Sequence, residues 1–420
     1  MKRLVYILYI CIALLPLFAN AQQVGKEHFE ASTAAVTNHP QAEEPVQHDS
    51  VIVSLLTVTE GNLVYELYGH TAIRVKEVGK HQSDWVFNYG TFSFQQPHFM
   101  WRFILGQTDY ELGVVPYAFF YDAYVREGRG ITEQVINLTS AESKRLVDAL
   151  SENLLPQNAT YRYNFFYDNC TTRAIKVIER AINGTVVWGE VDQAKSLRNI
   201  VDEFSQASPW NKFGQNLLLG AEADAEADVH KQMFAPLYAE RYITDAMVKG
   251  NDGTVRHLVA PARTLLPAQP QANNKFPISP LTAFGTLLVV TIGIGIIEYY
   301  KKKICWQYDV LLYLAQGLTG LIIAFLFFFS EHPAVGSNWL VLMFNPLPLV
   351  FFAWYMKQAV GGKRCWSMWV ESVMLISTLI VGIAGLQTLP VEVYLIIATL
   401  FVRLVAQYVN IPRSVSIEKK

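Results

Sequence analysis

The last third of the chain is almost continuously apolar, and this restricts the fold more than any other feature of the sequence. It contains five apolar segments, each close to the roughly 20 residues that an α-helix needs to cross a bilayer. The predicted spans are Leu281–Tyr300, Val310–Phe329, Asn338–Met356, Trp366–Leu386 and Pro390–Tyr408. The sequence therefore predicts a five-helix transmembrane domain over residues 281–408, followed by a short tail over residues 409–420.

Basic side chains fix the predicted orientation of these helices, because short cytoplasmic loops are rich in Lys and Arg. Such residues follow the first span, separate the third span from the fourth, and end the chain: Lys301, Lys302, Lys303, Lys357, Lys363, Arg364, Arg413, Lys419 and Lys420. The alternate loops, Ser330–Ser337 and Gln387–Thr388, carry none. The pattern predicts a multi-pass protein of the bacterial inner membrane, with its N-terminal domain in the periplasm and its C-terminus in the cytoplasm.

The N-terminus has the pattern of a secretory signal peptide over residues 1–21. Lys2 and Arg3 precede an apolar run, and Ala19-Asn20-Ala21 has the small-x-small form of a cleavage site. A retained membrane anchor is the alternative, because the apolar run approaches membrane length.

Two stretches predict flexible linkers that flank one large external domain. Residues 22–49 are rich in Ala, Gln, Glu, His and Pro, and residues 258–280 are rich in Pro. Residues 50–257 between them are enough for one substantial core. The net charge of −2 argues against a nucleic-acid partner, which needs clustered basic surface.

Strand patterns precede helical patterns in this domain, which predicts an α+β fold. The predicted strands are Val51–Val58, Thr71–Lys76, Asp84–Tyr89 and Gln134–Leu138. The predicted helices are Ser140–Asn153, Cys170–Ile182, Leu197–Ser205 and Phe234–Lys249.

Cys170 is the one cysteine that the predicted topology exposes to the oxidising periplasm, and it has no partner there. An unpaired thiol in that compartment is a liability unless its reactivity is used. Asp168 or Asn169 can cap a helix that begins at Cys170. The dipole and free N–H groups of that helix would favour a thiolate and hold an oxyanion. The alternative is a small buried cysteine on a core helix.

A nucleophilic thiol also needs a base. His70 opens a predicted strand that would hold its ring rigidly, and His98 is the reserve candidate. Asn88, on the next strand, is placed to orient the imidazole. A structural histidine and a polar residue at a strand end are the alternatives. Gly-x-Ser-x-Gly, His-Glu-x-x-His, Walker and Cys-x-x-Cys motifs do not occur, so serine-hydrolase, zinc and nucleotide chemistry lack support.

Three segments carry a resemblance to a known family: Tyr68–Arg74, Phe87–Phe92 and Tyr163–Arg173. Together with Glu331-His332-Pro333 and Asn345-Pro346 in the apolar part, they resemble Lnb, the lipoprotein N-acyltransferase family of Bacteroidota. The order His, polar residue, Asn-Cys is more distantly similar to the permuted papain-like group that includes lecithin:retinol acyltransferase and NlpC/P60 relatives. The resemblance covers nearly all of the mature chain and implies a permuted papain-like periplasmic domain.

The resemblance also implies an activity. An acyl chain would pass from a membrane phospholipid, through a thioester on Cys170, to the N-terminal amine of a diacylglyceryl-cysteine lipoprotein. His70 would act as general base and acid, and Asn88 would take the polar position, where relatives often have His. The implied partners are the phospholipid donor, the diacylated lipoprotein acceptor and the bilayer, and no metal or cofactor is needed.

Further residues of the external domain are candidates for contact with a lipid. The aromatic stretch Phe92–Leu105, which includes Trp101, would dock at the membrane interface or line an acyl groove, with core packing as the alternative. Arg102 and Arg173 are candidates for binding a phosphate, unless Arg173 pairs with Asp168.

The apolar part adds candidates of its own. Asn338 and Trp339 near the outer face, and the break at Asn345-Pro346, indicate where a lipid would enter. Glu371 and Arg403 predict a structural ion pair or snorkelling side chains near the inner side.

Two other functions stay open. A cell-wall amidase or endopeptidase of NlpC/P60 type would need an open polar cleft and would leave the apolar half without a role. A non-catalytic membrane scaffold would have Cys170 buried.

Overall fold

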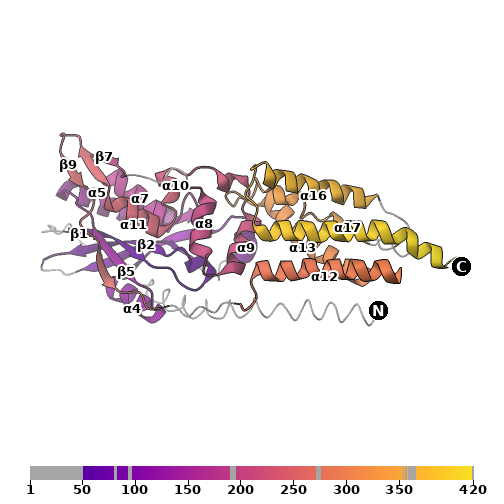
Figure 1. Cartoon of the computed structure of the whole chain (residues 1–420). Coiled ribbons are helices and arrows are strands. Elements are labelled where there is room, and N and C mark those ends of the chain that lie inside the picture. The colour runs from indigo at the N-terminus through magenta and orange to yellow at the C-terminus, as the bar shows by residue number, and fades with distance from the viewer. Residues whose placement is uncertain are drawn as a thin grey trace.

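The computed structural model describes residues 51–79, 83–92, 97–189, 195–270, 276–352, 354, 357 and 366–418, with side chains up to residue 410. The predicted signal peptide and the predicted linker 22–49 lie outside the described residues. Figure 1 shows a part built of strands and helices at one end and a bundle of long helices at the other.

A seven-stranded antiparallel sheet forms the centre of the N-terminal part. Its strand order is β10-β5-β1-β2-β3-β4-β6. The bounds are β1 (Val51–Val58), β2 (His70–Glu77), β3 (Asp84–Thr91), β4 (Asp109–Pro116), β5 (Ile131–Val135), β6 (Thr160–Arg162) and β10 (Arg263–Leu266). The inner strand β1 is almost wholly apolar because both faces of the sheet are covered: Leu55 packs into one cluster and Leu56 into another.

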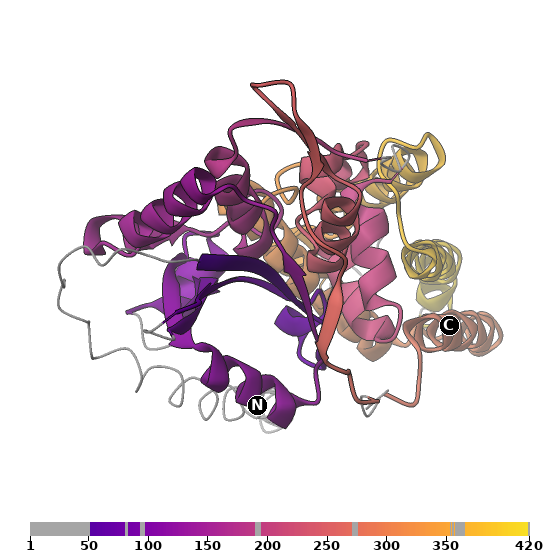
Figure 2. The same cartoon turned by 90° about the vertical axis from the view of Figure 1, so that its left-hand side faces the viewer.

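Helices lie on both faces of this sheet (Figure 2). The larger core lies between one face and α5 (Ser140–Asn153), α7 (Cys170–Ala181), α8 (Leu197–Ser205) and α11 (Pro236–Thr244). The opposite face packs against α4 (Tyr117–Glu127), whose Phe120 is buried with Ala72 and Val86. The α+β class predicted from the sequence agrees with this mixed arrangement.

Helix α7 forms because its apolar residues recur at helical spacing and its first turn is capped. Ala174, Ile175, Val177, Ile178 and Ala181 are all buried against the sheet and its neighbours. The helix begins at Cys170, as predicted.

Several predicted elements differ from the structure. Strand β5 begins three residues before the predicted strand Gln134–Leu138. The helix predicted over Phe234–Lys249 is wrong only at its C-terminal end, because α11 ends at Thr244 and β8 (Met247–Gly250) pairs with β7 (Gly184–Val187) and buries Val248. Sheet pairing with a distant strand overrides the local helical pattern there. The predicted linker 258–280 supplies β10 to the main sheet, beside β5.

Short elements complete this part of the chain: η1 (Val64–Glu66), α3 (Phe99–Ile104), α6 (Pro156–Ala159), α9 (Pro209–Leu218), η2 (Ala221–Asp224), α10 (Val229–Gln232) and β9 (Val255–His257). Strand β9 pairs with β8 to complete a second, three-stranded sheet.

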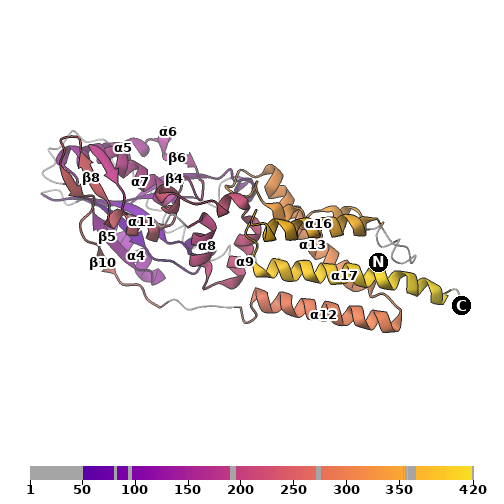
Figure 3. The same cartoon turned by 45° about the horizontal axis from the view of Figure 1, so that its top comes forward.

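Three helices in the described residues are long and apolar enough to cross a membrane: α12 (Pro280–Lys301), α13 (Trp306–Phe329) and residues Val391–Asn410 of α17 (Val391–Glu418). They run side by side away from the sheet (Figures 1 and 3). The apolar helix α16 (Ser367–Ile383) is shorter. The described residues therefore do not confirm the predicted count of five spans.

The predicted span Asn338–Met356 is not one continuous helix. It contains η3 (Trp339–Val341) and α14 (Leu347–Val350), with Asn345 and Pro346 between them. Pro346 and Pro348 cannot donate backbone hydrogen bonds, which breaks the helical ladder. Gln316 of α13 donates from Nε2 to the Met343 carbonyl at 2.9 Å and satisfies one group that the break leaves unpaired.

A buried ion cluster joins the three long helices. Arg403 of α17 lies 2.6 Å from Glu298 of α12 and also pairs with Asp309 of α13. All three side chains are almost fully buried. The expectation that Arg403 pairs with Glu371 is wrong, because Glu371 instead accepts a hydrogen bond from Gln316.

The sheet-containing part and the helical bundle are in direct contact. Phe213 of α9 packs against Phe284 of α12, with ring centroids 5.1 Å apart. Gly220 donates from its backbone to the Ala334 carbonyl at 2.8 Å. A Cβ atom at Gly220 would lie only 2.4 Å from the backbone nitrogen of Asn338, so the two backbones touch there. This junction fixes the catalytic candidates relative to the membrane helices.

Candidate active site

Cys170, His70 and Asn88 come together at one end of the main sheet. Strand β2 begins at His70, and β3, which runs antiparallel to it, ends three residues after Asn88. His70 Nε2 lies 3.1 Å from Asn88 Oδ1. Because this contact occupies Nε2, Nδ1 is the ring nitrogen left for the Cys170 thiol at the start of α7. All three residues are partly exposed.

The electrostatics of the pair favour an ionised thiol. Burial raises the pKa of Cys170, but the charge and hydrogen bond of His70, with smaller contributions from Thr71 and Thr171, lower it to about 7. Burial lowers the pKa of His70, whereas Cys170 and Asn88 raise it, and the net direction is upward. These opposite shifts describe a thiolate beside an imidazolium, the form of the pair that can attack a carbonyl.

The cap of α7 is Asn169 and not Asp168. The Asn169 side-chain oxygen accepts hydrogen bonds from the backbone N–H groups of Thr171 and Thr172 at 2.9 and 3.0 Å. These two amides are therefore already used, and the prediction that the helix amides hold an oxyanion needs correction for both. Asp168 instead accepts a 2.8 Å hydrogen bond from Arg173, so its carboxylate is paired.

A small space beside Gly90 adjoins the thiol. Gly90 has a φ of +88°, next to a register shift in the β3–β4 pairing between Asn88 and Thr91. A Cβ atom on Gly90 would lie 3.4 Å from Cys170 Cβ, 3.9 Å from Tyr161 Oη and 4.0 Å from the Cys170 backbone nitrogen. The absence of a side chain at Gly90 thus leaves room next to one N–H and one O–H group.

Tyr161 is the functional candidate that the sequence did not reveal. Its hydroxyl is buried and has no hydrogen-bond partner among the described residues. The Arg173 guanidinium lies over its ring, 3.6 Å from the centroid. Burial and the charge of Cys170 raise the pKa of Tyr161, so its hydroxyl stays protonated and can donate. An unused buried donor at this position suits an oxyanion that forms only during reaction.

Arg173 lies at the site, but its guanidinium is already engaged. It pairs with Asp168 and stacks on Tyr161, as one of the two sequence-based alternatives expected. Arg102 lies on α3, where it pairs with Asp109 and donates to the Gln107 carbonyl. Neither arginine is a free cation for a phosphate group.

The remaining predicted contacts lie at the membrane end of the structure. Asn338 is 2% exposed, and its Nδ2 donates to the Leu217 carbonyl at 2.7 Å. This binding joins the two parts of the chain. Trp339 is exposed beside it. Trp101 is exposed on α3, and its ring contacts Phe325 of α13.

The reserve candidate His98 lies elsewhere, as the N-cap residue of α3. His332 donates from Nε2 to the Phe103 carbonyl at 2.6 Å. Among the described residues, no group of His, Cys, Asp and Glu side chains has the arrangement of a metal site.

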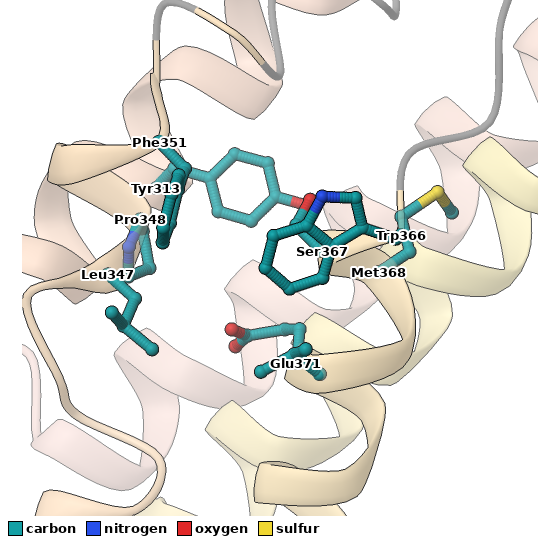
Figure 4. Close-up of a pocket in the computed structure, with 9 residues that line it drawn as sticks. Tyr313, Leu347, Pro348, Phe351, Trp366, Ser367, Met368 and Glu371 are labelled. Carbon is teal, nitrogen blue, oxygen red and sulfur yellow. The ribbon is translucent and has the colours of Figure 1, made fainter.

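A cavity of about 60 Å³ lies in the helical bundle between α13, α14 and α16. The Glu371 carboxylate points into it, opposite Leu347 and Pro348 (Figure 4). Its lining residues are Tyr313, Leu347, Pro348, Phe351, Trp366, Ser367, Met368, Val370 and Glu371. None of the residues gathered around Cys170 takes part in this cavity.

Two family models match the chain. The Lnb N-terminal periplasmic domain matches residues 38–203, and the Lnb transmembrane domain matches residues 271–414. No curated protein and no solved structure gives a significant match. The two matches cover most of the chain and agree with a membrane protein that has a periplasmic N-terminal part. The resemblance seen in the sequence is confirmed, and the chain belongs to the Lnb family.

Proposed function

We propose that this protein is a lipoprotein N-acyltransferase of the inner membrane, with its C-terminus in the cytoplasm. It would move an acyl chain from a phospholipid to the N-terminal amine of a diacylglyceryl-cysteine lipoprotein. The observation that carries the proposal is the placement of Cys170 beside His70, whose other ring nitrogen is held by Asn88. Membership of the Lnb family and the contact between the periplasmic part and the membrane helices support a lipid substrate.

In the first half-reaction the Cys170 thiolate attacks an ester carbonyl carbon of the phospholipid. The carbonyl oxygen becomes an oxyanion in the space beside Gly90, where the Cys170 N–H and the Tyr161 O–H are the available donors. The carbon–oxygen bond to the glycerol then breaks. His70 gives its proton to the departing alkoxide, which leaves a lysophospholipid and an acyl thioester on Cys170.

In the second half-reaction the neutral α-amine of the lipoprotein attacks the thioester carbonyl. His70 accepts a proton from the amine as the new carbon–nitrogen bond forms. The carbon–sulfur bond breaks and restores the Cys170 thiolate. The products are an N-acylated lipoprotein and an enzyme ready for another phospholipid, with no net change in protons on the pair.

The test is transfer by the purified full chain in phospholipid nanodiscs, with a diacylglyceryl-cysteine peptide as acceptor and mass spectrometry as readout. Wild type should add one acyl chain to the peptide, and Cys170→Ala should add none. Cys305→Ala is the matched control, because this cysteine lies at the start of α13, remote from the proposed chemistry. Transfer by Cys170→Ala at the wild-type rate would contradict the mechanism. Cleavage of a cell-wall peptide without any acyl transfer would favour the amidase function instead.

A further inference from the structure

Helix α3 is attached to the outer end of the membrane helix α13. The Ser330 hydroxyl donates to the Ile104 carbonyl at 2.8 Å, and the Glu331 backbone N–H donates to the Leu105 carbonyl at 2.8 Å. His332 holds the Phe103 carbonyl, and a Cβ atom on Gly106 would lie 2.6 Å from the His332 nitrogen. These contacts leave no gap between the end of α3 and the end of the span.

Helix α3 also exposes apolar side chains. Met100 is 57% exposed, Trp101 is 59% exposed and Phe103 is 44% exposed. The Trp101 ring contacts Phe325, with centroids 5.8 Å apart. Phe325 lies four residues, or about 6 Å along the axis, before the end of α13. The Trp101 ring therefore lies on the membrane side of the outer end of α13, at the level of the lipid carbonyls and upper acyl chains.

A series of stacked rings leads from α3 into the periplasmic part. Phe103 stacks on Phe99 with centroids 6.1 Å apart, and Phe99 stacks on Phe92 at 5.8 Å. Phe92 stacks on Tyr110 at 4.8 Å, and Tyr110 stacks on Tyr163 at 4.1 Å. The interplanar angles are 24° or less, so the rings form one continuous stack, in which Phe99 and Tyr110 are buried.

The inner end of this series belongs to the same apolar cluster as the thiol, because Tyr110 lies in that cluster and both Tyr163 and Cys170 pack against it. Tyr110 also sits opposite Tyr161 in the pairing of β4 with β6. The ring series thus connects the membrane-facing helix to the residues around Cys170.

A cluster of four charged side chains fixes the geometry at the membrane surface. Arg162 lies 2.9 Å from Asp109 and 3.2 Å from Glu331, and Asp109 also pairs with Arg102. These pairs join the sheet, α3 and the end of α13. Their positive and negative charges balance, so the cluster positions α3 and does not supply a free cation.

We propose that α3 lies in the outer leaflet and admits a glycerophospholipid, whose acyl chain follows the ring series from Phe103 to Tyr163 and brings its ester to Cys170. The occupant is a bilayer lipid because the exposed face of α3 continues the lipid-facing surface of α13, where Phe328 and Phe329 are 69% and 65% exposed. The delivery of the ester to Cys170 rests on the proposed function. The position of α3 in the leaflet is independent of that function.

Two readouts test the proposal with the full chain in nanodiscs. The first is the fluorescence of Trp101, obtained as the difference in tryptophan emission between wild type and Trp101→Phe. It is measured in nanodiscs with and without phospholipid that carries bromine close to its carbonyls. The bromine should quench the Trp101 emission, and unquenched emission would overturn the placement of α3. This readout does not depend on any enzymatic activity.

The second readout compares two acyl donors, bilayer phospholipid and soluble p-nitrophenyl butyrate. Met100→Glu/Trp101→Glu should slow acylation of Cys170 by bilayer phospholipid at least about tenfold, the factor that 1.4 kcal/mol of lost binding produces. Acylation by the soluble ester should keep its wild-type rate. The matched control is Phe119→Glu on α4, also an exposed aromatic residue at 63%, which should change neither rate.

Equal slowing with both donors would overturn the entry route, because it would indicate damage to the site itself. Unchanged acylation by bilayer phospholipid in the double variant would overturn it as well. A wild-type protein that phospholipid never acylates would refute the proposed function, and the quenching measurement would still decide where α3 lies.

Discussion

His70 and Asn88 lie on neighbouring antiparallel strands, with His70 Nε2 3.1 Å from Asn88 Oδ1. This contact sets which ring nitrogen serves the thiol, because a ring held at Nε2 offers Nδ1 to Cys170. We predict that Asn88→Ala lowers the rate of Cys170 acylation by about 10- to 100-fold, as loss of an orienting partner does at other sites. Stopped-flow acylation with p-nitrophenyl butyrate measures this rate. An unchanged rate would show that the ring needs no orienting partner.

The thiol should titrate near neutral pH. With the Cys170 pKa lowered to about 7, alkylation by iodoacetamide should rise with pH with its midpoint there. His70 stabilises the thiolate, so His70→Ala should move the midpoint upward, toward the ordinary thiol value of about 8.5. The measurement is the alkylation rate of Cys170 against pH, read by mass spectrometry of its peptide. A midpoint that stays near 7 in His70→Ala would remove His70 from this role.

Loss of the Tyr161 hydroxyl should slow chemistry more than binding. We expect Tyr161→Phe to lower kcat by about 100-fold with little change in KM, the usual effect of removing one oxyanion donor. Tyr89→Phe is the matched control, because its hydroxyl bonds Asn153 and its ring also contacts Tyr161. An equal loss of kcat in Tyr161→Phe and Tyr89→Phe would mean that the Tyr161 hydroxyl contributes to packing and not to the oxyanion.

The junction between the two parts of the chain can be tested with two glycines, Gly214 inside α9 and Gly220 just after it. Gly220→Ala should cost about 1–3 kcal/mol of stability, because the new Cβ would meet backbone atoms of Ser337 and Asn338. Gly214→Ala has free space around it and should stabilise α9 by about 0.5–1 kcal/mol. Thermal unfolding in detergent measures both changes. Equal effects of the two substitutions would show that the close approach at Gly220 is not a constraint.

The ion cluster between the membrane helices should behave as a unit. Arg403→Met removes the one cation and leaves Glu298 and Asp309 buried together, which should cost about 3–5 kcal/mol. Adding Glu298→Gln and Asp309→Asn to this variant should recover most of the loss, because no buried charge is then unpaired. The unfolding temperature in detergent is the readout. A triple variant no more stable than Arg403→Met would argue against charge as the cause.

Local patterns in the sequence predicted the elements that support the site, but not all the groups at the site. The apolar stripe of α7 and the capping residue before it predicted a helix starting at Cys170, because both signals lie within one helix. Tyr161 gave no such signal. It lies on a three-residue strand, and its relation to Cys170 depends on the pairing of β4 with β6 and on the bare backbone at Gly90.

Sequence patterns also failed to predict contacts in the membrane part where the interacting residues are far apart in the chain. Hydropathy predicted α12, α13 and the apolar part of α17, because each is a continuous apolar run. It could not assign Arg403 to Glu298 and Asp309, which are about 100 residues away in the chain. The break at Asn345-Pro346 is visible in the sequence, but the apolar run around it still predicts one span where the structure has η3 and α14.

The contact of Gly220 with the backbone of Asn338 also bears on which amines the proposed enzyme can reach. Because the two backbones touch at this joint, it would hold the thiol at one height above the bilayer. A lipoprotein carries its N-terminal amine on a cysteine whose own lipids hold it at the membrane surface. A secreted protein without lipid offers the same chemical group at no fixed height. Under the proposed function, this joint would select acceptors by the height of their amine above the membrane and not by their sequence.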